Sequence, residues 1–455
     1  MPTENRDYNL PQEGDADWHV PVNENWQLID ADVQAALEAA QEALDAATSD
    51  TSDSTDGSTS DTTDDSTTDS TTGGTGFTWD QTHVDTSWLT DAAVNDTLNV
   101  EKVTSLDLEG SGSITEAVQN GGSDPTVIVF EVGGVIDIGG GPYWRMEQPN
   151  TYIAGQTAPS PGISMIRGGP RLEAENVIVE HMSFFCGDDV NDTTKAGAVT
   201  IDEQPNVLLN HCTAAWATDV NIRVPDGGGP GAFINGICTE ALNNSSNPEA
   251  PHGYGFNARY DGKWDLMGNI WSHNWKRNPR SRHPDVDIIW VNNYVWNWGK
   301  RLYHGREDEG PDIDWIGDVA EGGPDTDIGE GVFENNKATV YWEDNTLIPS
   351  DTPLNDGNVD YVDQAMNLPD GLSVSDLTPS SELADALVPS AGPRPADRPP
   401  QEQRIVDDFV NRGGEIIDHH DEVGGYPSYS PNMRSLNPPS TGVLDWVQQY
   451  TNEVE

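Results

Sequence analysis

Four basic side chains within seven residues are the strongest chemical feature of this sequence. They are Lys276, Arg277, Arg280 and Arg282, in the segment WKRNPRSRH. Because Pro279 cannot donate a hydrogen bond to a sheet, the segment is predicted to lie at the end of a strand and in the following loop. Guanidinium groups bind carboxylate or sulfate through paired hydrogen bonds, so the cluster predicts an anionic ligand. The alternative is neutralisation by nearby acids such as Asp285 and Asp287.

Three acids follow predicted strands at places where neighbouring coils of the chain could bring them together. Asp219 lies in WATDVN just after a strand, Glu240 closes the next strand, and Asp189 ends the one before. Carboxylate oxygens are the ligands that Ca²⁺ prefers, so these acids are candidate metal ligands. With 78 acids in the chain, the alternative for each is a solvated surface group.

Two further features could contact a ligand. His252 lies in the tight loop PHGYG, where its ring could be held at a cleft, although a structural histidine fits the pattern equally well. Six Trp residues between Trp264 and Trp298 could form a platform on which sugars stack. Stacking inside the core is the alternative for them.

Composition restricts the class of protein. The 455 residues carry 78 acids and 22 basic residues, a formal charge of −56, which excludes a nucleic-acid binder held by basic patches. No stretch of 18 apolar residues is present, so no membrane span is expected. Three Cys predict no disulfide framework. The acidity extends over 77–455 (60 acids and 21 basic residues), which predicts an extreme halophile, where molar salt screens charges within about 3 Å.

Composition also predicts three parts along the chain. Residues 1–47 are predicted to contain one amphipathic helix over 30–47, and the sequence names no partner for this segment. Residues 48–76 consist almost only of Ser, Thr, Asp and Gly and are predicted to be a disordered linker. Residues 77–455 are predicted to form the folded domain. No standard export signal is visible at the N-terminus.

The folded domain repeats a pattern of short apolar runs closed by polar turns. The runs lie at 176–184, 206–214, 232–240, 264–272, 286–296 and 338–348. Their starts are 22–32 residues apart, except for a last gap of 52, about two repeats. One strand per repeat predicts an all-β fold, a parallel β-helix solenoid, and a propeller would need more regular hairpins.

The same repeats place like residues in register. Asn210, Asn235, Asn269, Asn293 and Asn345 lie near equivalent turns and could form an amide ladder, although Asn is common in turns generally. Cys212 and Cys238 occupy one register and are predicted to form a buried stack of small residues.

Several of these segments, in order, resemble motifs of the pectate lyases of the right-handed β-helix type. They are 176–183 (NVIVEHMS), 206–221 (NVLLNHCTAAWATDVN), 239–242 (TEAL), 251–255 (PHGYG), 273–281 (HNWKRNPRS) and 291–299 (VNNYVWNWG), with weaker similarity extending over about 100–430. The resemblance implies a secreted, extracellular enzyme that binds an acidic polysaccharide. It implies cleavage of polygalacturonate by β-elimination, with Ca²⁺ as cofactor and a 4,5-unsaturated product.

The resemblance also implies roles for individual residues. An Arg in an R-x-P-x-x-R motif removes the C5 proton in this family, which makes Arg277 the base and Arg282 a clamp for the substrate carboxylate. Arg280, Lys276 and His252 would support substrate binding, and Asp219, Glu240 and Asp189 would bind Ca²⁺. Relatives commonly carry a Lys just before Pro-His-Gly, where this chain reads NPEAPH.

Two other functions remain open from the sequence. A β-helix polygalacturonase would need paired carboxylates about 6.5–9.5 Å apart and no Ca²⁺. A carbohydrate-binding β-helix without catalytic activity would bind the polymer and leave it intact.

Overall fold

The structure is a computed structural model that describes residues 76–455, with gaps at 142, 191–194, 203–204, 226–227, 260, 306–309 and 335–336. The predicted segment 1–47 and nearly all of the predicted linker 48–76 lie outside the described residues, so their helix and disorder stay predictions. Within the described residues, no helix is both long enough and apolar enough to span a membrane.

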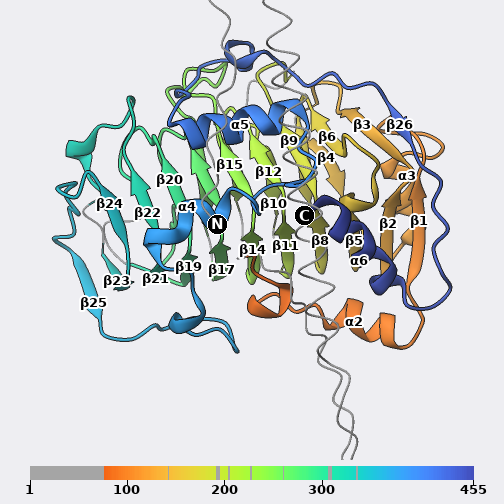
Figure 1. The fold of residues 1–455 in the computed structure, drawn as a ribbon, viewed down its shortest axis with the longest axis horizontal. Coiled ribbons are helices and arrows are strands. Elements are labelled where there is room, and N and C mark those ends of the chain that lie inside the picture. Colours follow the sequence, from red (N-terminus) through yellow and green to blue (C-terminus); the bar gives the residue numbers. More distant parts are fainter. Residues whose placement is uncertain are drawn as a thin grey trace, which may run out of the picture. The chain divides into compact units, whose positions relative to one another are not determined.

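The described chain winds into a solenoid of three parallel sheets (Figure 1). In these residues, sheet 1 has 11 strands in the order β1 (Asn99–Val103), β2 (Thr126–Phe130), β5 (Thr151–Ala154), β8 (Val177–Glu180), β11 (Val207–Asn210), β14 (Gly231–Ile234), β17 (Gly262–Met267), β19 (Val286–Val291), β21 (Asp312–Ile316), β23 (Ala338–Glu343) and β25 (Val359–Val362). Sheet 2 has ten described strands, in the order β26 (Asn432–Met433), β3 (Val132–Asp137), β6 (Ile163–Ile166), β9 (Met182–Phe185), β12 (Thr213–Ala215), β15 (Ile237–Thr239), β18 (Ile270–Ser272), β20 (Tyr294–Trp296), β22 (Val319–Glu321) and β24 (Thr346–Ile348). Sheet 3 has five, in the order β4 (Tyr143–Met146), β7 (Gly169–Leu172), β10 (Val199–Ile201), β13 (Val220–Val224) and β16 (Tyr254–Ala258). The predicted parallel β-helix is confirmed; β26, which pairs antiparallel with β3, is the exception among these pairings.

Each apolar run predicted as one strand contains two strands separated by a bend. The run 206–214 forms β11, bends at His211 and continues as β12. His211 has a left-handed backbone with a φ of 49°, and His181 and Asn235 have φ values of 55° and 52° at the equivalent bends of the neighbouring coils. Apolar residues continue on both sides of the bend, so hydrophobic periodicity does not reveal it. The 52-residue gap holds one more coil, formed by β21 and β22, as its length predicted.

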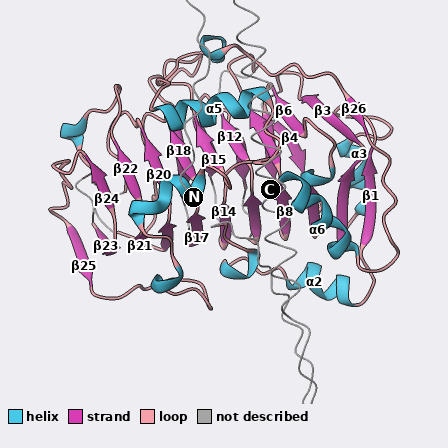
Figure 2. Cartoon of the chain, viewed as in Figure 1, coloured by secondary structure: helices cyan, strands magenta, loops and turns pink. Residues whose placement is uncertain are grey.

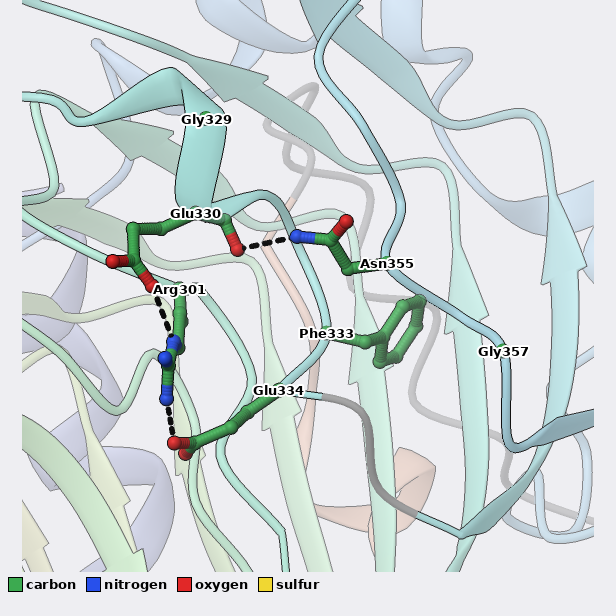
Figure 3. A pocket seen from close by; sticks show the side chains of 7 residues that line it. All are labelled: Arg301, Gly329, Glu330, Phe333, Glu334, Asn355 and Gly357. Atoms are coloured by element: carbon green, nitrogen blue, oxygen red, sulfur yellow. Dashed lines mark hydrogen bonds and ion pairs between the residues drawn. The ribbon is translucent and has the colours of Figure 1, made fainter.

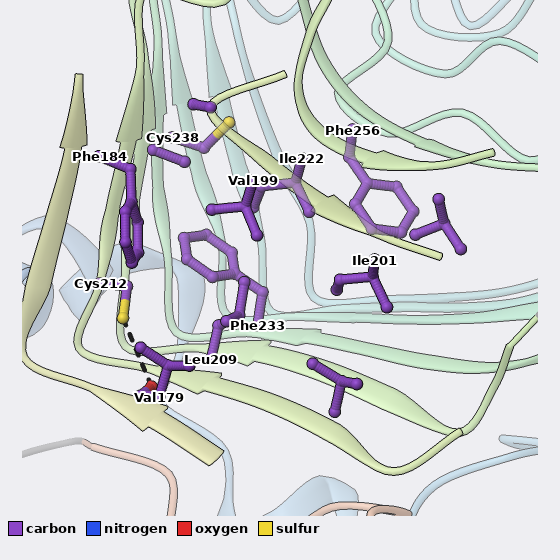
Figure 4. Close-up of a cluster of buried hydrophobic side chains, with 14 of the residues drawn as sticks. Val179, Phe184, Val199, Ile201, Leu209, Cys212, Ile222, Phe233, Cys238 and Phe256 are labelled. Atoms are coloured by element: carbon purple, nitrogen blue, oxygen red, sulfur yellow. Dashed lines mark hydrogen bonds between the residues drawn. The ribbon is translucent and has the colours of Figure 1, made fainter. Parts of the chain in front are cut away.

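The interior of the solenoid is filled by side chains from all three sheets (Figure 4). Cys212 and Cys238 are fully buried there beside Phe184 and Phe233, so they pack as small apolar residues. The Cys212 thiol lies 3.4 Å from the carbonyl oxygen of Val179. The structure therefore confirms that both Cys are buried core residues.

An amide ladder connects successive coils, as predicted for Asn269, Asn293 and Asn345. The Asn293 Oδ1 accepts a hydrogen bond from the Asn269 side chain at 3.0 Å. Asp318 occupies the next rung. Its Oδ1 accepts from the backbone N–H of Asn293 at 2.6 Å, and its own backbone N–H donates to Asn345 Oδ1 at 2.9 Å. Asn210 and Asn235 bond to each other at 2.8 Å in a separate pair.

The outer faces of sheets 1 and 2 are covered by helices (Figure 2). The described α-helices are α2 (Ser87–Val94), α3 (Ile114–Gly121), α4 (Leu383–Leu387), α5 (Pro400–Asn411) and α6 (Val443–Val454), and the short 3-10 helices are η1 (Trp79–Gln81), η2 (Gly155–Thr157), η3 (Ile328–Glu330), η4 (Val374–Asp376), η5 (Ser380–Glu382) and η6 (His420–Val423). Apolar residues of α2 and α6 pack on sheet 1, and those of α4 and α5 pack on sheet 2. Neither apolar cluster includes a described residue of sheet 3.

Candidate active site

The predicted basic segment lies beside sheet 3, one rung beyond β16. Tyr254, the first residue of β16, pairs with β13 on one side and forms a parallel bridge with Lys276 on the other. The Tyr254 amide donates to the carbonyl oxygen of Asp219 at 3.1 Å, and the Phe256 amide donates to that of Arg277 at 2.8 Å. Three neighbouring rungs therefore bring Asp219, Tyr254 and Arg277 to the same edge of sheet 3.

Arg277 is a partly buried guanidinium group held against an aromatic ring. Its guanidinium carbon lies 3.6 Å from the centre of the Tyr254 ring, and its backbone has a left-handed φ of 62°. Its Nε is buried and has no hydrogen-bond partner in the described residues. Burial lowers the pKa of Arg277 to about 10, although the nearby Tyr254 and Asp219 groups oppose this shift.

Arg280 and Lys276 share this electrostatic environment. Burial, together with the charges of Arg277 and Arg282, lowers the pKa of Arg280 to about 9. The Lys276 Nζ lies 4.5 Å from the centre of the Trp275 ring, and burial also lowers its pKa. The structure therefore concentrates positive charge at this edge of the sheet.

The predicted alternative, neutralisation by Asp285 or Asp287, does not occur for Arg277 and Arg280 in the described part of the chain. Asp285 instead contacts His283, with 3.3 Å between a carboxylate oxygen and Nδ1. The pKa of Asp287 is raised, mainly by burial and then by Asp312, so its environment favours the neutral form. No described carboxylate lies within ion-pair distance of Arg277 or Arg280, which leaves both groups available to an anionic ligand.

Asp219 and His252 lie together on the side of Tyr254 away from the basic segment. The His252 Nε2 lies 3.4 Å from Asp219 Oδ1 and 3.7 Å from Glu249 Oε2, while Nδ1 lies 2.8 Å from the Glu249 carbonyl oxygen. Arg223 Nε is 3.8 Å from the Asp219 carboxylate. Asp219 is buried, and in the described residues its carboxylate accepts no hydrogen bond from another side chain.

Lys195 contacts the loop that precedes Pro-His-Gly in this chain. It comes from the coil before Asp219, and its Nζ lies 2.8 Å from Glu249 Oε2. Lys195 thus reaches this loop from about 50 residues upstream in the sequence. Its partner, the Glu249 side chain, is half exposed.

The structure does not bring Glu240 into this group. Glu240 is fully buried under α5, where Arg404 donates to its two carboxylate oxygens at 2.7 and 2.8 Å and the Trp216 indole donates at 2.8 Å. Burial alone would raise the pKa of Glu240, but the hydrogen bonds and charge of Arg404 hold it below its usual value. Both oxygens are committed to the contact between α5 and sheet 2, which corrects the prediction of a metal ligand here.

Asp189 also lies apart from Asp219 in the described contacts. Its side chain is 61% exposed, and a carboxylate oxygen lies 3.7 Å from Nε2 of His420, in the C-terminal region. The neighbouring Asp188 accepts from the backbone amide of Ser246 at 2.8 Å. Of the three predicted metal ligands, only Asp219 lies next to the basic cluster.

The Trp residues mostly serve the core. Trp264, Trp271, Trp290, Trp296 and Trp298 are all buried. Trp275 is partly exposed and stacks on Tyr254, with 6.3 Å between ring centres and 15° between planes. The predicted sugar platform is therefore limited to the partly exposed Trp275, since Tyr254 is buried.

A hollow of about 360 Å³ lies further along the solenoid, and its acids make it a different environment (Figure 3). Arg301 at its edge donates to Glu330 at 2.7 Å and also pairs with Glu334. Its guanidinium group is therefore neutralised by two carboxylates, unlike Arg277. Arg277 and Arg280, which have no ion-pair partner among the described residues, mark the candidate anion site, rather than the hollow.

Sequence reasoning missed Tyr254, Lys195 and Arg223 at this site. Tyr254 stands next to the singled-out His252, and only the coil spacing shows that it faces Arg277. Lys195 approaches Glu249 from another coil, which the sequence does not reveal, whereas Arg223 lies four residues after Asp219 on the same coil. The signal that could have found Tyr254 is its place two residues after His252, at the start of a strand.

No protein-family model matches the chain. The protein named Probable pectate lyase C from Aspergillus flavus is 25% identical over 357 residues, 75% of this chain and 80% of that protein. Among solved structures, a pectate lyase from Bacillus sp. N165 in complex with trigalacturonate is 12% identical, with a TM-score of 0.43, over 65% of this chain and 93% of its own. The major allergen from cedar pollen is also 12% identical, with a TM-score of 0.41, over 65% of this chain and 88% of its own. The chain is therefore similar in sequence to a protein named as a probable pectate lyase over three quarters of its length, and it has a parallel β-helix fold.

Proposed function

We propose that the chain is a Ca²⁺-dependent pectate lyase that cleaves polygalacturonate by β-elimination at Arg277. The observation that carries this proposal is the pair of guanidinium groups, Arg277 and Arg280, which have no carboxylate partner in the described residues. They lie in a protein whose formal charge is −56, next to the buried carboxylate of Asp219. A polymer of uronic acids supplies the anionic groups that this site lacks.

The Asp219 carboxylate fits a hard cation. It is buried, it accepts no side-chain hydrogen bond in the described residues, and Glu249 offers a second, solvent-facing carboxylate near the same His252 nitrogen. Ca²⁺ takes six to eight oxygen ligands, so water and the substrate carboxylate would complete the set. We therefore assign Asp219 to cation binding; Glu249 would join it only by giving up its ion pair with Lys195, and Glu240 and Asp189 are left out.

The bound cation would neutralise the uronate carboxylate and stabilise the negative charge that develops beside it. The neutral Arg277 guanidine takes the proton from C5. The electron pair of the broken C5–H bond forms the C4–C5 double bond, the C4–oxygen glycosidic bond breaks, and the leaving oxygen takes a proton from water. The product end carries a 4,5-unsaturated uronate.

The environment of Arg277 supports its role as the base. An ordinary Arg is always protonated, but burial lowers the pKa of Arg277 to about 10. About one molecule in a thousand is then neutral at pH 7, and half are neutral near pH 10. The Tyr254 ring face favours the charged guanidinium and so opposes this shift, but the effect of burial is larger.

The remaining groups would bind and orient the polymer. Arg280 and Arg282 would grip uronate carboxylates, Lys276 adds charge, and His252 lies beside Asp219. The exposed part of Trp275 offers an apolar surface for a sugar ring. We also infer an extracellular location, where this substrate occurs, and the halophilic adaptation stays a prediction.

One experiment separates this proposal from the alternatives. The full chain is incubated with polygalacturonate in molar salt, with excess Ca²⁺ or with a chelator, and two products are followed. A lyase produces ultraviolet-absorbing unsaturated ends and reducing ends together, and both stop when Ca²⁺ is removed. Reducing ends without absorbance indicate a polygalacturonase, and binding without either product indicates a carbohydrate-binding protein.

A further inference from the structure

Two histidines far from sheet 3 face one carboxylate at the end of α6. His181 and His211 occupy equivalent bends between sheets 1 and 2 on neighbouring coils, and their rings stack 4.9 Å apart at 6°. Glu455 Oε1 lies 3.1 Å from His211 Nε2 and 3.5 Å from His181 Nε2. Contacts between α6 and η2 hold this end of the helix over the bends, near β8 (Figure 1). The Val454 carbonyl also accepts from the Ala396 amide at 2.9 Å.

The hydrogen bonds of the two rings fix which nitrogen carries the proton. The His181 Nδ1 lies 2.6 Å from the carbonyl oxygen of Pro393, and the His211 Nδ1 lies 3.2 Å from that of Gly392. A carbonyl oxygen only accepts, so Nδ1 is the protonated nitrogen in each ring and Nε2 presents a lone pair. The His181 Nε2 is buried and has no hydrogen-bond partner in the described residues.

Three acceptor atoms therefore meet without a donor between them. One extra proton could join His211 to Glu455, but it would leave the buried His181 Nε2 without a partner. Leaving a buried polar atom unpaired costs about 1–3 kcal/mol. A cation in the centre would satisfy all three atoms at once.

We propose that His181, His211 and Glu455 bind a divalent transition metal of the Zn²⁺ class. Their ligand atoms all lie within 4.8 Å of one another. Zn²⁺ takes nitrogen and oxygen ligands at about 2.0–2.2 Å, which puts neighbouring ligand atoms of a tetrahedron about 3.3–3.5 Å apart. The two distances to Glu455, 3.1 and 3.5 Å, lie close to this spacing.

The surroundings have two further properties of a metal site. Metal-binding histidines usually donate their other ring N–H to a carbonyl or carboxylate, as both rings do here. The Glu455 side chain is 32% exposed, so an ion can enter from solvent, and a water can take the fourth position. Two imidazoles and one carboxylate favour Zn²⁺ or a similar ion over Ca²⁺, which prefers oxygen.

This site would be structural, and it does not depend on the proposed lyase activity. It would connect α6 to two coils of the solenoid at the bends between sheets 1 and 2, whereas Arg277 lies at sheet 3. Metal binding there is expected to raise the thermal unfolding temperature and to leave the turnover of polygalacturonate unchanged.

The test is titration of the metal-free full chain with Zn²⁺, and with Co²⁺ for its visible absorption, in excess Ca²⁺ to occupy oxygen sites. His181→Asn, His211→Asn and Glu455→Gln are the variants. Asn is compatible with the bend, because Asn235 occupies the equivalent position of the next coil with the same left-handed backbone. His419→Asn is the matched control, since His419, His420 and Asp421 form the other described group that could hold a metal.

The natural protein is expected to bind one equivalent of Zn²⁺ that raises its unfolding temperature. Each of the three variants should bind at least about 100-fold more weakly, and His419→Asn should bind normally. Glu455→Gln keeps the test valid if a histidine variant does not fold, because it changes one partly exposed side chain. Absence of a bound equivalent in the natural protein, or unchanged affinity in His211→Asn and Glu455→Gln, would overturn the proposal.

Discussion

The guanidinium group of Arg277 lies over the ring of Tyr254, 3.6 Å from its centre, although the two residues belong to different rungs of the solenoid. The ring face attracts the cation without offering a carboxylate to pair with it. The ring therefore favours the charged form of Arg277, and the pKa is lowered because burial outweighs this attraction. The contact with Tyr254 fixes the position of the proposed base, and burial at that position lowers its pKa.

Replacing the base should abolish most of the turnover and preserve the fold. Arg277→Lys keeps a cation but cannot reproduce the planar group over Tyr254, and we expect kcat to fall by about 10²–10⁴-fold. The rate of unsaturated-product formation measures this, with circular dichroism as the check on folding. Arg145→Lys, on the same sheet and paired with Glu173, is the control and should leave kcat unchanged. Turnover of Arg277→Lys close to that of the natural protein would reject Arg277 as the base.

The pH profile should follow the lowered pKa of Arg277. The base must be neutral and Arg280 must stay charged, so kcat/KM is expected to rise about tenfold per pH unit up to about pH 9, to pass a maximum between the pKa values of about 9 and 10, and to fall above them. Initial rates between pH 7 and 11 at saturating Ca²⁺ measure the profile, with unfolding monitored at each pH. A plateau that begins near neutral pH would point to a different base.

Removing the charge of Asp219 should change the Ca²⁺ requirement, whereas removing the charge of Glu240 should change the free energy of unfolding. Asp219→Asn is expected to raise the Ca²⁺ concentration needed for half-maximal activity by about tenfold or more, because it removes a buried ligand oxygen with charge. Glu240→Gln should leave this requirement unchanged and lower the unfolding free energy by about 3–5 kcal/mol, because it breaks the buried pair with Arg404. Calcium titrations of activity and chemical denaturation measure the two effects. A Ca²⁺ requirement that shifts in Glu240→Gln but not in Asp219→Asn would reverse the assignment.

The residues of the amide ladder should contribute unequally to the free energy of unfolding. Asn293→Ala removes the acceptor of the buried Trp271 indole, 3.0 Å away, and of Asn269, so we expect a loss of about 2–4 kcal/mol. Asn345→Ala lies at the partly exposed end and should cost about 1 kcal/mol. Denaturant unfolding at constant salt measures both. Equal losses would show that the ladder position does not determine the contribution.

The fold could be predicted because its signal repeats. Apolar runs at coil spacing indicated stacked parallel strands, and the register of Asn293 and Cys212 followed from the same spacing. The bends could not be predicted, because residues such as His211 adopt a left-handed backbone that depends on packing within the coil. For the same reason, each apolar run that was predicted to form one strand contains two strands.

The sequence predicted the positions of those candidate-site residues that lie close together in one segment or directly after a strand. Arg277 and Arg280 belong to one short segment, and Asp219 directly follows a strand, so their meeting required only the stacking of coils. Glu240 was misplaced because its partner, Arg404, lies 164 residues away on a helix that packs from outside. Long-range contacts of this kind leave no trace in the spacing of motifs.

The proposed catalytic groups occupy neighbouring layers of the stack, which sets a rule for how such a protein can diversify. Whole layers could be gained or lost before Asp219 or after Arg282 without separating these groups, because each layer packs mainly on its immediate neighbours. A layer inserted between Asp219 and Arg277 would move them apart by about 4.8 Å. Variation in length among descendants of this molecule is therefore expected at the two ends of the stack, with the middle constant.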